Sequence, residues 1–179
     1  MNFEKQSTFK NTRNTSTSIT WLRWRMVHHF SVFCTYINRL VLRQRPHHYT
    51  FNDLKKLPKN TVGHHVYQQL SSAQLSYQPK LLFHDAKHVI LGYSMQIQDE
   101  LRLNAFLLGN RSVNPLGLIY LAICCSVVPE FIPQLKKAFQ RGKQSNSLKS
   151  MQFSTLINQP LHLVITLISS KQTTIQNHS

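Results

Sequence analysis

Acidic side chains are scarce in this sequence: 6 of its 179 residues are Asp or Glu, against 21 Lys and Arg. The formal net charge of +15 excludes an acidic surface and favours anionic partners such as nucleic acid, phospholipid headgroups or acidic substrates. Charge alone does not choose among these partners. With so few carboxylates in the chain, a place where several of them gather is informative.

Cysteine and glycine are also rare, with three and five residues. Cys124 and Cys125 are adjacent, and vicinal cysteines pair only with strain, so a disulfide framework is excluded and a reducing compartment is expected. Few glycines, few segments of alternating polarity and a lack of hairpin turn signals argue against a β-sheet. The sequence therefore predicts an all-α fold, a single-domain helical bundle.

Long apolar runs are missing as well. The longest uncharged stretch, 112–129, has an apolar centre of about 13 residues, whereas a membrane-spanning helix needs roughly 20. We interpret this stretch, which opens at Pro115, as a buried core helix in which the two adjacent cysteines are small core residues. No long apolar region follows the N-terminal charges, so no secretory signal is expected.

Composition divides the chain into four segments. These are a basic Ser/Thr-rich leader expected to be disordered (1–20), a basic amphipathic helix (21–48), the main helical domain, for which metal binding is argued below (49–170), and a polar tail (171–179).

Capping and turn signals predict further helices inside the main domain. Asn52 or Asp53 can cap a short first helix, and turn residues at 57–63 precede the next one. The remaining helices are expected at 66–75, 131–141 and 156–168, with a polar linker at 145–150. Three histidine doublets without acidic neighbours are expected at the surface: His28 and His29, His47 and His48, and His64 and His65.

The helix that follows the leader is basic and amphipathic, and its role stays open. Its apolar residues recur at helical spacing, at Leu22, Met26, Phe30, Phe33, Ile37, Leu40 and Val41. One interpretation is a helix packed on the core. A second is a surface helix on an anionic membrane, with Trp21 and Trp24 at the interface. A third is a mitochondrial presequence, because the segment is rich in Arg and Ser and poor in acids.

Two histidines four positions apart form the most informative cluster. On a helix, His84 and His88 share one face, one turn apart, and Asp85 can lean toward the same point. Imidazole nitrogen and carboxylate oxygen together suit a divalent metal ion. We expect Zn²⁺, with Fe²⁺, Mn²⁺, Co²⁺ and Mg²⁺ as alternatives. Without a metal, the same residues would be partly buried histidines beside solvated charges.

Glu100 is the expected fourth ligand. It lies twelve residues after His88, which on one straight helix would place it about 18 Å away. A break is therefore needed, and Gly92 supplies it, with Ser94 as a cap. A second helix over 95–108 would then fold back so that Glu100 faces the histidines and Asp99 points aside. The sequence thus predicts a metal site between two consecutive helices.

The spacing His-Asp-x-x-His, eleven residues, Glu resembles the motif of the coenzyme Q (ubiquinone) biosynthesis protein family, member four. Here the motif consists of His84, Asp85, His88 and Glu100. The resemblance extends through 57–63, 92–93, 105–110 and 138–142, and it covers about residues 50–170. It implies an all-helical fold, a metal held by the four motif residues and a hydrophobic groove for a polyprenyl chain. The implied activity is that of a carbon–carbon lyase: C1-decarboxylation, in one form oxidative, of a polyprenylated hydroxybenzoate precursor.

The resemblance also implies partners and a location. The partners are the polyprenylated aromatic substrate, other quinone biosynthesis proteins and an anionic membrane surface. A peripheral protein of this kind would lie on the cytoplasmic face of the inner membrane in a bacterium, or on the matrix side of the mitochondrial inner membrane in a eukaryote. Homo-oligomerisation stays open.

Two other function classes compete with this enzyme. One is a non-catalytic prenyl-lipid-binding scaffold that organises a membrane-associated quinone biosynthesis complex. The other is a nucleic-acid-binding protein, which rests on net charge alone, because zinc-finger spacing and stacking aromatics are missing. We therefore expect no nucleic-acid partner.

Overall fold

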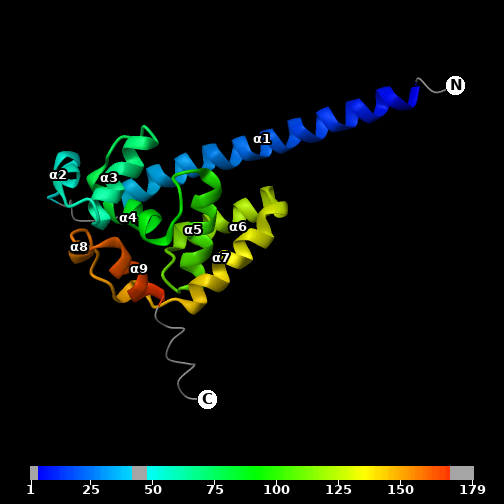
Figure 1. Cartoon of the computed structure of the whole chain (residues 1–179). Coiled ribbons are helices and arrows are strands. Elements are labelled where there is room, and N and C mark those ends of the chain that lie inside the picture. The colour runs from blue at the N-terminus through cyan, green and yellow to red at the C-terminus, as the bar shows by residue number, and fades with distance from the viewer. Residues whose placement is uncertain (1–3, 42–47, 170–179) are drawn as a thin grey trace, which may run out of the picture.

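Helices account for the regular structure of the computed structural model, which describes residues 4–41 and 48–169 (Figure 1). Among these residues there is no strand, and the β-type pairing is a single antiparallel bridge between Thr61 and Pro160. The helical elements are α1 (Glu4–Val41), α2 (Phe51–Lys56), α3 (Val62–Ser72), η1 (Pro79–Leu81), α4 (Leu82–Leu91), α5 (Ile97–Gly109), α6 (Pro115–Val127), η2 (Pro129–Phe131), α7 (Ile132–Gln144), η3 (Leu148–Ser150), α8 (Phe153–Leu156) and α9 (Leu161–Ser169). The all-α, single-domain prediction is confirmed, while the predicted polar tail lies outside the described residues.

Helix α1 is longer than the predicted amphipathic helix. It begins at Glu4, within the leader for which the composition predicts no regular structure. Ser, Thr and Asn have weak helix propensity, but extending a helix that already exists is far less costly than nucleating one. The boundary between leader and helix at residue 20 is therefore not a structural boundary.

The face of α1 that packs on the body differs from the predicted apolar stripe. Val27 and Cys34, seven positions apart, are buried against α5 and α6, and Trp24 and Phe30 pack beside them. Three residues of the predicted stripe are instead largely exposed: Leu22, Met26 and Phe33. Helix α1 thus packs on the core through one face and leaves a second apolar face in solvent, and the membrane role of that face stays a prediction.

Side-chain caps fix where the helices of the main domain begin. Thr50 caps α2 by accepting a hydrogen bond from the Asp53 amide, and Asp53 accepts one from the Thr50 amide at 2.8 Å, which is a complete capping box. The cap is thus Thr50 and not Asn52 or Asp53, because it is the Thr50 hydroxyl that accepts from a first-turn amide, while Asp53 lies inside the helix and completes the box. Thr61 caps α3, and Asn114 caps α6 just before Pro115.

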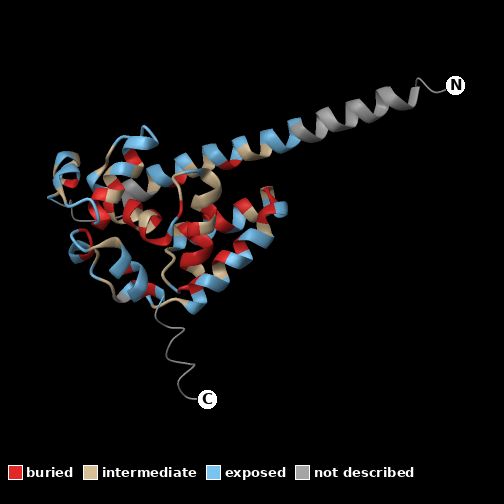
Figure 2. Ribbon diagram, viewed as in Figure 1, coloured by how far each residue is buried: buried red, intermediate tan, exposed pale blue. Residues whose placement is uncertain are grey.

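Helix α5 contributes side chains to two hydrophobic clusters, and much of its ribbon is coloured as buried in Figure 2. Leu103 and Phe106 belong to the cluster that α5 shares with α2, α3, α4, α8 and α9. Leu101 and Ala105 belong to the cluster shared with α1, α6 and α7. Because α5 is buried on two sides, its position along the axis and its rotation are both fixed, and so is the direction of every side chain on it.

Helices α5 and α7 approach each other closely enough to require glycine on both sides. A Cβ atom at Gly109 would clash with the backbone oxygen of Phe139, and one at Gly142 would clash with that of Phe106. Asn110 then ties the ends of the two helices together: its amide nitrogen donates to the carbonyls of Gly142 and Asn146, at 3.2 and 2.9 Å. The crossing is therefore set by backbone contact and not by side-chain size.

Helix α6 has one buried face and one exposed apolar face. Tyr120, Leu121 and Cys124 are buried, which confirms a core position for Cys124, whereas Leu118 and Ile119 are about half exposed. By length and composition, no single helix in the described ranges suffices to cross a membrane. Helix α6 taken together with the segment Pro129–Gln144 would suffice, but the two are bent by 108°.

The histidine doublets lie mostly where the sequence predicts them. His28, His29 and His48 are exposed, and His47 lies outside the described residues. His64 was expected at the surface but is buried, and its Nδ1 lies 3.2 Å from the Lys55 carbonyl oxygen. Its face of α3 packs on α2, which the absence of an acidic neighbour could not reveal.

Candidate metal centre

The turn between α4 and α5 brings the motif residues together. Helix α4 ends at Gly92, whose φ of 70° lies in the left-handed region that glycine adopts without strain, and the Tyr93 amide closes the helix by donating to the His88 carbonyl at 2.8 Å. Four residues later α5 begins and runs back past α4. The predicted break is confirmed, but the N-cap of α5 is Gln96 and not Ser94.

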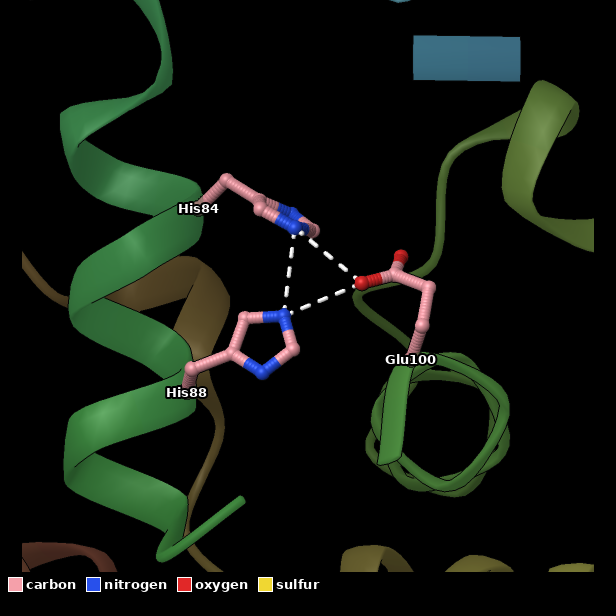
Figure 3. Close-up of side chains that lie close together, drawn as sticks. All are labelled: His84, His88 and Glu100. Atoms are coloured by element: carbon pink, nitrogen blue, oxygen red, sulfur yellow. Dashed lines mark hydrogen bonds and ion pairs between the residues drawn. The ribbon is translucent and has the colours of Figure 1, made fainter. Parts of the chain in front are cut away.

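His84 and His88 project from α4 toward Glu100 on α5 (Figure 3). Glu100 Oε2 lies 3.2 Å from His84 Nε2 and 3.0 Å from His88 Nε2, and the two imidazole nitrogens are 3.2 Å apart. Ligands about 2.0–2.1 Å from a tetrahedral zinc ion lie roughly 3.3 Å from one another. Both the donor atoms and their separations therefore fit a divalent metal ion.

Asp85, the remaining residue of the motif, does not join these three side chains. The cluster whose donor atoms all lie within 4.8 Å of one another consists of His84, His88 and Glu100. Asp85 follows His84 by one position, which turns its side chain by about 100° around the helix axis. Asp85 is buried, and it lines a cavity, described below, that the three converging side chains also line.

Opposite charges and burial compete at this site. Burial opposes ionisation of Glu100, but His84 and His88 outweigh it and hold the pKa of Glu100 well below its ordinary value. Burial likewise disfavours the charged form of His84, but the Glu100 carboxylate outweighs it and raises the pKa of His84. For Asp85 burial dominates and raises the pKa to about 6. Glu100 is thus an anion at neutral pH, as a metal ligand must be.

Residues outside the cluster hold its side chains in place. His88 Nδ1 lies 2.8 Å from the Ser94 carbonyl oxygen, so Nδ1 carries the hydrogen and Nε2 is left free as a ligand. Asp99 in turn holds Ser94 by accepting hydrogen bonds from its amide and hydroxyl at 2.9 and 2.6 Å. Asp99, which was expected to point aside, thus begins a chain of contacts that ends at the imidazole of His88.

Sequence reasoning missed Asn104. Its side-chain amide donates to Glu100 Oε1 at 2.9 Å, which leaves Oε2 directed at the histidines. Asn104 is buried and lies one helical turn after Glu100. A polar residue four positions after a proposed ligand, inside an apolar run, was the available signal.

A cavity of about 310 Å³ leads to the cluster. Its walls come from α1, α3, α4 and α5, together with the segments that precede α4 and α5. Several of the lining residues are apolar: Val32, Leu70, Leu75, Leu81, Met95 and Ile97. The three converging side chains thus line a space that also has apolar walls and so suits a ligand with an apolar part. That α1 forms one wall of this cavity was not predicted from the sequence.

No protein-family model matches the chain, and no curated protein matches it. Among solved structures, the chain is similar to the crystal structure of a "Putative ubiquinone biosynthesis protein" from Nostoc punctiforme PCC 73102. The TM-score is 0.58 at 14% sequence identity, and the similarity covers 92% of this chain and 93% of that chain. At this identity the likeness establishes a shared all-helical fold.

Proposed function

We propose that this chain is a metal-dependent enzyme of ubiquinone biosynthesis that removes the C1 carboxylate of a polyprenylated hydroxybenzoate. The observation that carries the proposal is the convergence of His84, His88 and Glu100 in the lining of a cavity that also has apolar walls. The motif spacing and the fold shared with the Nostoc protein support the same pathway.

The proposed metal is Zn²⁺, held by His84, His88 and Glu100, with Fe²⁺, Mn²⁺, Co²⁺ and Mg²⁺ as alternatives. A bound divalent ion would supply positive charge to an oxygen of the substrate and so stabilise the charge that develops as the carboxylate leaves. Two neutral imidazoles and one carboxylate leave a dication with a net charge of about +1, which suits an anionic substrate.

Asp85 is the residue we assign to proton transfer in the non-oxidative reaction. When CO₂ leaves, the electron pair of the broken carbon–carbon bond stays on ring carbon C1, and a proton must take its place. The Asp85 carboxyl faces the same cavity, and burial raises its pKa to about 6. That value allows it to give up a proton and recover it near neutral pH.

The apolar walls of the cavity are proposed to hold the start of the polyprenyl chain. A longer chain would have to leave the cavity, and we propose that it does so into an anionic membrane to which the protein binds peripherally. The exposed apolar face of α1, with Leu22, Met26 and Phe33, lies beside Arg25, as in helices that lie on a membrane surface. Other quinone biosynthesis proteins would be the partners there.

The test combines metal analysis with CO₂ release. Purified protein, loaded with Zn²⁺ or with each alternative ion, is incubated with 3-polyprenyl-4-hydroxybenzoate. We expect His84→Ala and Glu100→Ala to lose both the metal and CO₂ release, while His162→Ala, an exposed histidine on α9, keeps both. Full metal content and full turnover in the folded His84→Ala protein would refute the proposal. Binding of the acid without CO₂ release would indicate the scaffold role instead.

A further inference from the structure

A second, smaller cavity of about 40 Å³ adjoins the candidate metal centre. It is lined by residues of α1, η1, α4, α5 and α6, and it shares Ser31, Thr35, Leu81, His84 and Glu100 with the larger cavity. The two spaces therefore meet at the cluster. The smaller one is large enough for a water molecule or the oxygen atoms of one functional group, but not for an aromatic ring.

Tyr120 lines this smaller cavity from α6. Its side chain is 3% exposed, and its hydroxyl is the one buried side-chain polar atom in the described part of the chain that lacks a hydrogen-bond partner. Ser31 and Cys124 lie close enough to the hydroxyl to influence its pKa, but neither meets the geometry of a hydrogen bond with it. A buried hydroxyl left unpaired costs about 1–3 kcal/mol, so its retention calls for a ligand that pairs with it.

The ring of Tyr120 is held firmly, so the hydroxyl is directed by the fold. It stacks on Phe30 of α1 with ring centroids 5.8 Å apart, and it belongs to the cluster packed between α1, α5 and α6. Burial raises the pKa of Tyr120 above its ordinary value, so the phenol keeps its proton and is available as a donor. What it would bind must therefore be an acceptor.

The surroundings indicate which acceptor fits. Asn104 already donates its amide to Glu100, so among the buried side chains of this cavity the donor that lacks a partner is Tyr120. One oxygen of the ligand would accept the hydrogen bond from Tyr120, and a second oxygen a short distance away would reach the candidate metal centre. A carboxylate supplies two such oxygens. The rest of such a ligand must be apolar to occupy the larger cavity, as the prenylated ring of an aromatic acid is.

We propose that the Tyr120 hydroxyl is a substrate-positioning group that donates a hydrogen bond to the carboxylate of an aromatic acid bound in the two cavities. This inference rests on the proposed function for the class of its ligand. It adds a residue from α6 to the candidate metal centre, whose three donor residues lie on α4 and α5.

The test is a comparison of two probes with two variants. Binding of 3-geranyl-4-hydroxybenzoate and of 2-geranylphenol, which lacks the carboxylate, is measured by calorimetry with Zn²⁺-loaded protein. We expect Tyr120→Phe to bind the acid about 10- to 100-fold more weakly, as for loss of a hydrogen bond to a charged group, and the phenol equally well. Tyr67→Phe, a partly buried tyrosine outside both cavities, is the control and should match the wild type with both probes.

Thermal unfolding separates positioning from a structural role. Because Tyr120→Phe removes an unpaired buried hydroxyl, it should unfold at the same temperature as the wild type or higher. An unchanged affinity for the acid, an equal loss with both probes, or failure of the wild type to bind the acid would each overturn the inference. If the wild type releases CO₂ but Tyr120→Phe binds the acid with unchanged affinity, this inference alone is refuted. If binding of the acid depends on Tyr120 but the wild type releases no CO₂, the proposed function alone is refuted.

Discussion

At the scale of single residues, the candidate centre is defined by which side chains converge and which only lie nearby. His84, His88 and Glu100 present their donor atoms to one point, whereas Asp85 is buried one position further round the helix. The buried acid and the three converging groups should therefore respond differently to substitution. The first prediction tests this difference.

The first prediction concerns Asp85→Asn. Because burial raises the folded-state pKa of Asp85 to about 6, from 3.8, ionising it costs the folded protein stability. In metal-free protein with chelator, the free energy of unfolding of Asp85→Asn should equal that of the wild type near pH 4. As pH rises through 6, the wild type should become progressively less stable than the variant. Above that pH the gain in the free energy of unfolding should be about 2–3 kcal/mol, measured by urea titration.

The same variant separates proton transfer from metal binding. Asp85→Asn should keep its zinc affinity within a few-fold of the wild type while losing CO₂ release. If zinc affinity falls as far as in His88→Ala, Asp85 is a ligand and the three-residue site is wrong.

The second prediction concerns Asn104, which holds Glu100 in place through Oε1. Asn104→Ala leaves all three donor residues intact but frees the carboxylate to rotate. Zinc affinity should fall roughly 10- to 100-fold, the usual effect of removing a residue that orients a ligand. The measurement is competition with a chromogenic chelator. Asn158→Ala, a change at an exposed asparagine, is the control, and an equal affinity in the two variants would contradict the prediction.

At the scale of elements, the site depends on how α5 is held. Helix α4 packs on one side of α5, and α7 crosses it where Gly109 and Gly142 bring the two backbones into contact. Neither glycine has a positive φ within the described chain, so their role is to allow close approach and not to relieve backbone strain. This crossing fixes the position of α5 and so of Glu100.

The third prediction is that Gly142→Ala strongly destabilises the protein. Its Cβ atom would press on the Phe106 carbonyl, and since that atom belongs to a backbone, the helices must separate. We expect a loss of about 3 kcal/mol in the free energy of unfolding, at the upper end for overpacking. Denaturant unfolding measures it. Gln140→Ala, at an exposed position on the same helix, should change stability by less than about 0.5 kcal/mol.

At the scale of the whole molecule, α1 both completes the cavity and carries the exposed apolar face. Its residues Ser31, Val32 and Thr35 line the larger cavity. Arg23 ties α1 to the body of the protein by donating to the Val127 carbonyl at the end of α6 and by forming a 2.7 Å ion pair with Glu130. Deleting the helix would therefore open the core as well as remove the proposed membrane contact. Membrane binding must be tested by substitutions on the exposed face.

The fourth prediction is that the combined change Leu22→Ser, Met26→Ser and Phe33→Ser weakens binding to vesicles. These side chains are each more than half exposed, so the fold should tolerate the change. Binding to vesicles rich in phosphatidylglycerol should fall about 10-fold or more, because apolar insertion is lost while the basic charge remains. Flotation assays measure it. Leu163→Ser with Leu167→Ser, on the exposed face of α9, should bind as the wild type does.

The sequence by itself determined the local parts of this protein. Helical spacing places His84 and His88 on one face of α4, and the glycine at position 92 permits the left-handed turn that ends the helix. Glu100 then returns to the histidines because it lies in the first turn of the next helix. Each of these follows from backbone geometry over a few residues, which is why the pair of helices and the three converging side chains could be predicted.

Tertiary structure decided what depends on contacts between distant segments. It separated Asp85 from the converging side chains, selected which face of α1 is buried, and placed Tyr120 from α6 beside residues of α1 and α5. Sequence periodicity shows that a helix has an apolar face, but not which other helix covers it. The three converging side chains of the candidate site therefore follow from local spacing, whereas the residues that line the cavity around them depend on how distant helices pack.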